Sequence, residues 1–248
     1  DDVLNRVRKD TLLVSVMHAN NETGIIQPVR EIGDELNDKE VYFHVDAAQS
    51  CGKLVDELKS MKYDLLSLTG HKMYAPQGIG ILVARTENYR KPPLRPLFFG
   101  GGHENGMRSG TLPTALICGL GKMCELISQN YKEYWNTYYE TKTKMLNILK
   151  ASNIEFYMNG EEKYCLPNTM NISFPGIDSE AFMIQTRSWC AISNGSACNA
   201  ASYDYSYVLK AMGIPDERMR SALRISWGKD RLDLQNFEQI IEIAGRMI

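Results

Sequence analysis

The stretch Leu65–Leu82 reads LLSLTGHKMYAPQGIGIL and places one lysine, Lys72, between two apolar runs. Lysine usually lies on a solvated surface, because burial of an unpaired ammonium group is costly. The runs before and after Lys72 are typical of buried strands, which we expect at Asp64–Leu68 and Gly80–Ala84. A lysine held between two buried strands therefore needs an explanation other than solubility.

The same pattern extends outward through the first half of the chain. Short β-rich runs alternate with amphipathic or glycine-bearing segments, and Pro28–Leu36 is typical of a helix with proline at its start. Further strands are expected at Leu12–Met17, Val41–Val45 and Leu97–Phe99. Most of these runs are continuously apolar, which predicts strands buried on both faces of a largely parallel α/β sheet.

The second half predicts a smaller α+β domain. Apolar residues at helical spacing from Leu112 to about Leu149 predict one long helix, or two in series, between the domains. The elements expected beyond it are a strand at Met170–Phe174, a helix at Ser179–Arg187, a strand at Leu223–Trp227 and a helix at Leu232–Ile248. We therefore expect a large domain over residues 1–128 and a C-terminal domain over residues 129–248.

The composition is that of an ordinary globular protein. The chain has 248 residues, 44% hydrophobic and 23% charged, with a net charge of -2. This balance gives no electrostatic reason to expect direct binding to nucleic acid or to a membrane surface, and no apolar run is long enough to span a bilayer.

Six cysteines without a CxxC pair favour a cytoplasmic protein with reduced thiols. A zinc site from Cys165, Cys190 and Cys198 lacks ligand spacing, so we expect no metal.

Polar side chains follow three of the predicted strands at the point where each strand ends. If the strands run parallel, these side chains meet at one edge of the sheet, where ligands gather in open α/β folds. The three groups are Asn20, Asn21 and Glu22; Asp46 and Gln49; and Thr69, His71 and Lys72.

An aspartate and a lysine at such an edge suit pyridoxal phosphate. The lysine forms an imine with the aldehyde, and Asp46 pairs with the protonated ring nitrogen, which keeps the ring an electron sink. Thr69 and His71 could hold the phosphate. Each residue also has a plain structural interpretation: Asp46 could cap a helix, His71 could bind a backbone carbonyl, and Lys72 could be exposed at a turn. The combination favours the chemical interpretation.

The order of the motifs along the chain resembles that of cysteine desulfurases, a family in the class V branch of fold type I pyridoxal phosphate enzymes. The matching motifs are MHANNETGIIQP, HVDAAQSCGK, SLTGHKMYAPQGIG, GGGHENGMRSGTLP, SNGSACNAAS and ALRISWG. The resemblance implies a homodimer in which Lys72 is the Schiff-base lysine and Asp46 faces the pyridine nitrogen. The other implied contacts are Gln49 with the ring hydroxyl, Thr69 and His71 with the phosphate, Thr111 with the phosphate of the partner subunit, Asn21 with cofactor and substrate, and Arg224 with the substrate carboxylate.

Cys198 lies in SNGSACNAAS among small and polar residues, which predicts an exposed, mobile loop. A nucleophilic cysteine needs access and thiolate character. The resemblance implies that the Cys198 thiolate attacks the sulfur of substrate L-cysteine, releases alanine and passes the resulting persulfide to an acceptor protein. The loop resembles that of the long-loop desulfurases, which supply iron–sulfur assembly, tRNA thiolation or DNA phosphorothioation. Asn194 and Asn199–Ala200 depart from the serine and threonine-serine of many of those relatives.

The resemblance leaves out the N-terminal part of the family, including a histidine that stacks on the pyridine ring. None of the histidines replaces it: His18 and His44 lie within strands or at strand ends, and His103 belongs to a different motif of the family. We therefore expect a missing N-terminal companion segment. Two alternatives remain open: a non-catalytic module that binds a sulfur acceptor, or a selenocysteine lyase or aminotransferase of the same fold.

Overall fold

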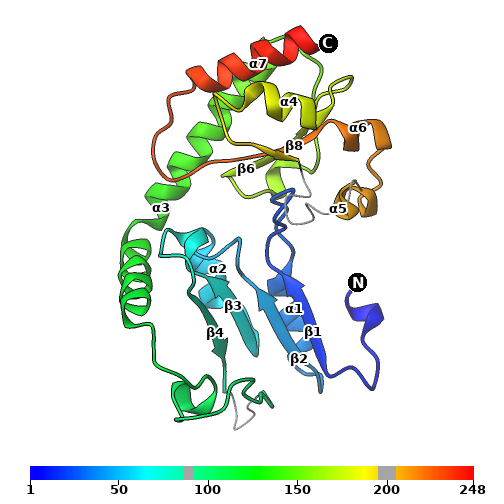
Figure 1. The fold of residues 1–248 in the computed structure, drawn as a ribbon. Coiled ribbons are helices and arrows are strands. Elements are labelled where there is room, and N and C mark those ends of the chain that lie inside the picture. The colour runs from blue at the N-terminus through cyan, green and yellow to red at the C-terminus, as the bar shows by residue number, and fades with distance from the viewer. Residues whose placement is uncertain (87–91, 195–204) are drawn as a thin grey trace. The chain divides into compact units, whose positions relative to one another are not determined.

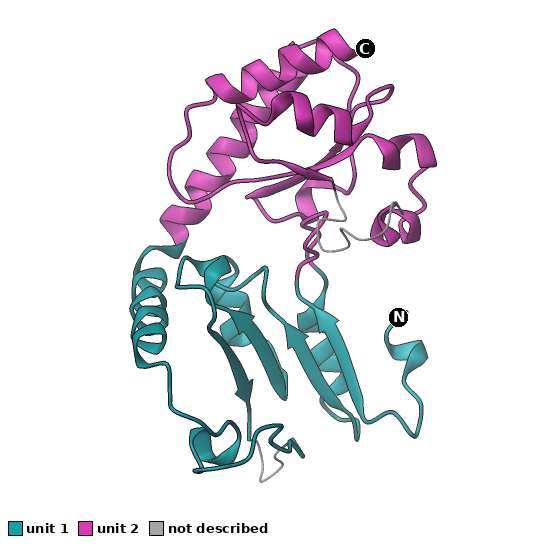
Figure 2. Ribbon diagram, viewed as in Figure 1, with its two compact units in different colours: residues 1–18, 27–131 teal, residues 19–26, 132–248 magenta. Residues whose placement is uncertain are grey.

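The computed structural model describes residues 1–86, 92–194 and 205–248 (Figure 1). The chain folds into two compact units (Figure 2). The first unit comprises residues 1–18 and 27–131, and the second comprises residues 19–26 and 132–248. The short segment 19–26 therefore belongs to the second unit, although it lies early in the chain. No pattern in the sequence indicated that this segment belongs to the second unit.

A four-stranded sheet forms the centre of the first unit. Its strands are β1 (Leu13–Met17), β2 (Tyr42–Asp46), β3 (Leu65–Thr69) and β4 (Gly80–Ala84), in that order across the sheet. The first three strands are parallel, and β4 runs antiparallel to β3. The prediction of a mainly parallel α/β sheet is confirmed.

Helices and 3-10 turns precede, connect and follow these strands. They are the 3-10 turns η1 (Leu4–Arg6), η2 (His71–Met73) and η3 (Glu104–Gly106), and the helices α1 (Val29–Leu36), α2 (Val55–Ser60) and α3 (Thr114–Ala151). Pro28 precedes α1, where its missing N–H costs no hydrogen bond. Of the two arrangements expected between Leu112 and Leu149, the structure has one long helix, α3, rather than two in series.

Two expectations for the first unit are wrong. Its core joins α1 to only one face of the sheet, through Phe43 and Val45, while Leu13 and Leu82 on the outer strands are exposed. The strands are therefore not buried on both faces by the described residues. Residues 97–99 form no strand: Leu97 is 88% exposed, and prolines 92, 93 and 96 before it lack the N–H group that a sheet needs.

The second unit is a layer of helices packed on an antiparallel sheet, as expected for an α+β domain. The sheet order is β5 (Tyr157–Met158), β6 (Thr169–Ser173), β8 (Ala222–Ser226) and β7 (Ser193–Asn194). The helical elements are η4 (Glu162–Tyr164), α4 (Ser179–Thr186), α5 (Tyr207–Ala211), α6 (Asp216–Arg220), α7 (Gln235–Met247) and the second part of α3. Strand β6 is buried along its whole length. No helix in the described part of the chain is both long and apolar enough to cross a membrane.

Candidate active site

The ends of β2 and β3 bring two of the predicted polar groups together in the first unit. Asp46 is the last residue of β2 and Thr69 the last residue of β3, and the two strands run parallel with Asp46 in register with Ser67. Their carboxyl ends therefore lie at the same edge of the sheet. Lys72 is the third residue after β3 and lies in η2. This edge is where ligands are expected in an open α/β sheet.

Local hydrogen bonds fix the polar groups at this edge. One carboxylate oxygen of Asp46 accepts a hydrogen bond of 2.9 Å from the N–H of Ala48, so Asp46 does stabilise the following turn. The hydroxyl of Thr69 lies 3.0 Å from Nδ1 of the exposed His71, with the donor set by the tautomer of the imidazole ring. The side chains of Thr69 and His71 are thus hydrogen-bonded to each other.

The backbone of η2 determines where Lys72 lies. The carbonyl of Gly70 accepts hydrogen bonds from the N–H groups of Met73 and Ala75, at 2.9 and 3.0 Å. Tyr74, with a φ of 67°, adopts the left-handed conformation that ends the turn. Lys72 is consequently half-buried at the end of a strand, neither in the core nor free on the surface.

A second lysine, which sequence reasoning missed, lies beneath this turn. Lys53 is 7% exposed, and its ammonium donates to the carbonyls of Gln49, at 2.9 Å, and of Lys72, at 3.4 Å. Burial, with a smaller contribution from the charge of Lys72, lowers the pKa of Lys53 to about 8. The signal that could have found it is a charged residue between Gly52 and the apolar pair Leu54–Val55.

The third predicted group lies in segment 19–26 and belongs to the second unit. Asn20 is buried, and its side-chain oxygen accepts hydrogen bonds from the N–H groups of Glu22 and Thr23. The guanidinium of Arg224, on β8, donates to the carbonyl of Asn21 at 3.0 Å. The structure therefore brings Asn21 and Arg224 together, and their roles as substrate contacts stay a prediction.

Glu22 anchors this segment. Its carboxylate is 4% exposed and accepts a hydrogen bond of 2.5 Å from the hydroxyl of Ser206, which also caps α5. Its main-chain carbonyl accepts from the side chain of Asn171 on β6. Burial raises the pKa of Glu22, while the Ser206 hydrogen bond and the charge of Arg224 oppose that rise. Glu22 was expected at a ligand edge, but its contacts are structural.

The three histidines considered for ring stacking have different surroundings. His44 on β2 lies between two serines, with Nδ1 2.8 Å from the hydroxyl of Ser15 and Nε2 3.0 Å from that of Ser67. His103 is exposed. His18 is fully buried, with Nε2 3.3 Å from a carboxylate oxygen of Glu57, which is an ion-pair distance without the alignment of a hydrogen bond.

We expect His18 to weaken the fold in acid. Burial lowers its pKa below 6.5 and outweighs the attraction of Glu57, so the unfolded state binds the proton more readily. The contribution of His18 to stability is complete above pH 6.5 and is lost as the pH falls through its folded pKa. Urea unfolding at pH 7, 6 and 5 should show a smaller loss for His18→Gln than for the parent. His103→Gln is the matched control, and equal losses in all three proteins would contradict the prediction.

Cysteine reactivity can be compared for five of the six thiols. Burial raises the pKa of Cys51 to about 11 and also raises the pKa values of Cys165 and Cys190, so these thiols are poor nucleophiles. Cys118 and Cys124 are exposed on α3. Cys198 lies outside the described residues. Within the described ranges, no three His, Cys, Asp or Glu side chains gather as metal ligands.

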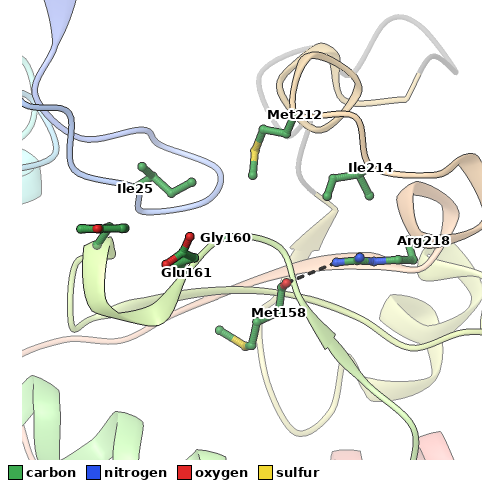
Figure 3. A pocket seen from close by; sticks show the side chains of 8 residues that line it. Ile25, Met158, Gly160, Glu161, Met212, Ile214 and Arg218 are labelled. Atoms are coloured by element: carbon green, nitrogen blue, oxygen red, sulfur yellow. Dashed lines mark hydrogen bonds between the residues drawn. The ribbon is translucent and has the colours of Figure 1, made fainter.

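A pocket of the second unit contains none of the predicted site residues. It has a volume of about 440 Å³ and is lined by Ile25, Met158, Gly160, Glu161, Tyr164, Met212, Ile214 and Arg218 (Figure 3). The guanidinium of Arg218 in its wall already donates to the carbonyl of Met158 and the side chain of Asn159. The chemistry of the predicted residues, not this hollow, indicates the active site.

The donor set in the first unit fits pyridoxal phosphate. It offers a carboxylate for a protonated ring nitrogen, a hydroxyl–imidazole pair for a phosphate and an amine for an aldehyde, in Asp46, Thr69 with His71, and Lys72. Thr111 lies in an exposed loop before α3 and is accessible to another molecule.

Comparison with known proteins agrees with this fold. Residues 1–230 match the model of the aminotransferase class-V family, and the chain belongs to that family. Cysteine desulfurase IscS of Proteus mirabilis is 40% identical over 247 residues, covering 97% of this chain and 59% of the relative. The chain thus spans 59% of the length of this curated relative.

Two solved structures extend the comparison. DndA from Streptomyces lividans shares 37% identity with a TM-score of 0.77, covering 91% of this chain and 63% of that one. SspA in complex with cysteine shares 35% identity with a TM-score of 0.72, covering 93% and 63%. The mixed α/β fold, with its mainly parallel sheet, is similar to that of the pyridoxal phosphate fold type I cysteine desulfurases.

Proposed function

We propose that this chain forms the larger part of a cysteine desulfurase that uses pyridoxal phosphate to convert L-cysteine into L-alanine. The observation that carries the proposal is the placement of Asp46 and Lys72 at the carboxyl ends of adjacent parallel strands, with the Thr69–His71 pair between them in sequence. The likeness to IscS, DndA and cysteine-bound SspA supports it.

Each residue of the first unit has a definite task in this proposal. Asp46 holds the ring nitrogen in its protonated form, Gln49 contacts the ring hydroxyl, and Thr69 and His71 bind the phosphate. When bound, pyridoxal phosphate supplies the electron sink that activates the bonds of an amino acid at its α-carbon. The Nζ atom of Lys72 attaches the cofactor and later serves as the base that moves the α-proton.

The substrate carboxylate is assigned to Arg224 and Asn21, and Asn21 also contacts the cofactor. A guanidinium presents two parallel N–H donors that match a carboxylate. The hydrogen bond from Nη1 of Arg224 to the Asn21 carbonyl fixes these two residues relative to each other. Binding at Arg224 would therefore place the substrate next to Asn21.

Sulfur transfer is assigned to Cys198. Its thiolate attacks the sulfur of L-cysteine; a sulfur–sulfur bond forms, the carbon–sulfur bond breaks, and the carbon takes a proton to become the methyl group of alanine. The persulfide on Cys198 then passes to an acceptor protein, such as a scaffold or carrier for iron–sulfur assembly or DNA phosphorothioation. A reducing cytoplasm suits a reaction that depends on a free thiol.

The partner of this chain is proposed to be a second copy of the same protein. Thr111 would reach the cofactor phosphate of the other protomer. The apolar side chains of Leu97 and Phe99, 88% and 84% exposed, belong to the same unit and offer surface for such a contact. Equilibrium sedimentation of the full-length protein tests this assembly.

Turnover of the full-length protein tests the function directly. With pyridoxal phosphate we expect a visible absorbance band, release of alanine from L-cysteine and one persulfide per chain. Absence of both the band and alanine, with binding of a sulfur acceptor intact, would instead identify a non-catalytic module. Turnover of selenocysteine but not cysteine, or formation of a keto acid, would indicate a lyase or an aminotransferase.

A further inference from the structure

The segment Cys51–Lys53 packs against the turn that carries Lys72. Gly52 has a φ of +78°, and a Cβ atom added there would meet Ile127 at 3.0 Å and the side chain of Met73 at 3.3 Å. The sulfur atoms of Cys51 and Met73 are 3.6 Å apart. Only a glycine permits this close approach, so the next residue, Lys53, is brought directly beneath η2.

The ammonium of Lys53 joins two segments that follow different strands. Gln49, whose carbonyl it binds at 2.9 Å, lies just past β2, and Lys72, whose carbonyl it binds at 3.4 Å, lies just past β3. A buried ammonium group is costly unless it is hydrogen-bonded, and here two of its three N–H donors are paired with main-chain carbonyls. The same ammonium group therefore ties the two turns of the candidate site together.

We propose that Lys53 is a positioning residue for Lys72, because its buried ammonium fixes the main chain of Lys72 relative to that of Gln49. The inference rests on the proposed function, because the position of Lys72 matters to the reaction only if its amine attaches the cofactor. Lys53 itself is assigned no contact with cofactor or substrate. Lys53 acts only through the carbonyl groups of the two turns, and it determines how far the amine of Lys72 can move from the edge that carries Asp46.

The test compares Lys53→Met, Lys53→Arg and Lys59→Met in the full-length protein. Lys59 lies close by in the exposed last turn of α2 and serves as the matched control. Pyridoxal phosphate at limiting concentration is reacted with each protein and trapped by borohydride, and peptide mass spectrometry measures the pyridoxyl group on Lys72. Hydrogen exchange of residues 71–75 is measured on the same proteins without cofactor.

We expect Lys53→Met to reduce the label on Lys72 about tenfold and to accelerate exchange in the turn by a similar factor, the effect of losing one hydrogen bond to a charged group. Lys53→Arg, which keeps the charge and the donors, should restore most of both signals, and Lys59→Met should match the parent. Parental labelling and exchange in Lys53→Met would overturn the inference.

Two other results would also lead to a definite conclusion. If Lys53→Met does not fold, Lys53→Gln replaces it, because its amide fills most of the space but is one bond shorter and cannot span both carbonyls. If Lys72 takes no label in the parent protein, the proposed function fails. The exchange comparison between Lys53→Met and Lys53→Arg then decides alone whether Lys53 holds the turn.

Discussion

Replacing Lys72 by alanine should abolish alanine formation from L-cysteine, with a loss of at least about a thousandfold in rate. The substitution removes the amine that attaches the cofactor and the base that moves the α-proton. Because the turn η2 is held by the Gly70 carbonyl and by Lys53 rather than by the Lys72 side chain, the fold should remain intact. Alanine release, the visible absorbance of the cofactor and the melting temperature are the three measurements.

Two variants make this experiment specific. Lys72→Arg keeps a positive charge but presents a guanidinium that remains protonated, so it should be as inactive as Lys72→Ala. Lys59→Ala removes a lysine from the exposed last turn of α2 and should have parental activity. Substantial turnover by Lys72→Arg would show that the positive charge, and not the free amine, is what the reaction needs.

Replacing Cys198 by serine should also remove desulfuration by at least about a thousandfold, because a hydroxyl group at neutral pH is a far weaker nucleophile than a thiolate. Cofactor absorbance and L-cysteine binding should survive, since neither is assigned to Cys198. The expected result is therefore a protein that binds cofactor and substrate but forms neither persulfide nor alanine. Mass spectrometry after a single turnover measures the persulfide.

Cys118→Ser is the matched control for this prediction. Cys118 is exposed on α3, so it tests whether accessibility alone gives a thiol this role. Its serine variant should keep parental turnover. If Cys198→Ser still forms product from L-cysteine at the parental rate, the sulfur does not pass through Cys198, and an aminotransferase or lyase reaction must be considered instead.

The sequence predicted the first sheet well because each of its strands is a short, mostly apolar run. The strands at Leu13–Met17, Tyr42–Asp46, Leu65–Thr69 and Gly80–Ala84 lie within one residue of the expected bounds at each end. The same reasoning failed at Leu97–Phe99, since apolar character alone cannot supply the N–H donors that the preceding prolines lack. It also overestimated how much of the sheet the chain buries.

The contacts that organise the candidate site were harder to predict from the sequence. Asp46, Thr69 and Lys72 follow strands and carry recognisable functional groups, so position and chemistry pointed to them together. Lys53 acts through its bonds to main-chain carbonyls, and Glu22 through Ser206, 184 residues away. Such bonds depend on how distant segments pack, and no local pattern records them.

Segment 19–26 also sets an order of events during synthesis of the protein. Its bond partner Arg224 lies 203 residues further along the chain than Asn21, so at ribosomal rates it is made about 10 to 40 s later. For most of that interval the carboxylate of Glu22 has no Ser206 to bind, because Ser206 lies 184 residues further along the chain than Glu22. The second unit needs residues 19–26 as well as residues 132–248, so it is completed much later in synthesis than the first unit, whose last residue is 131.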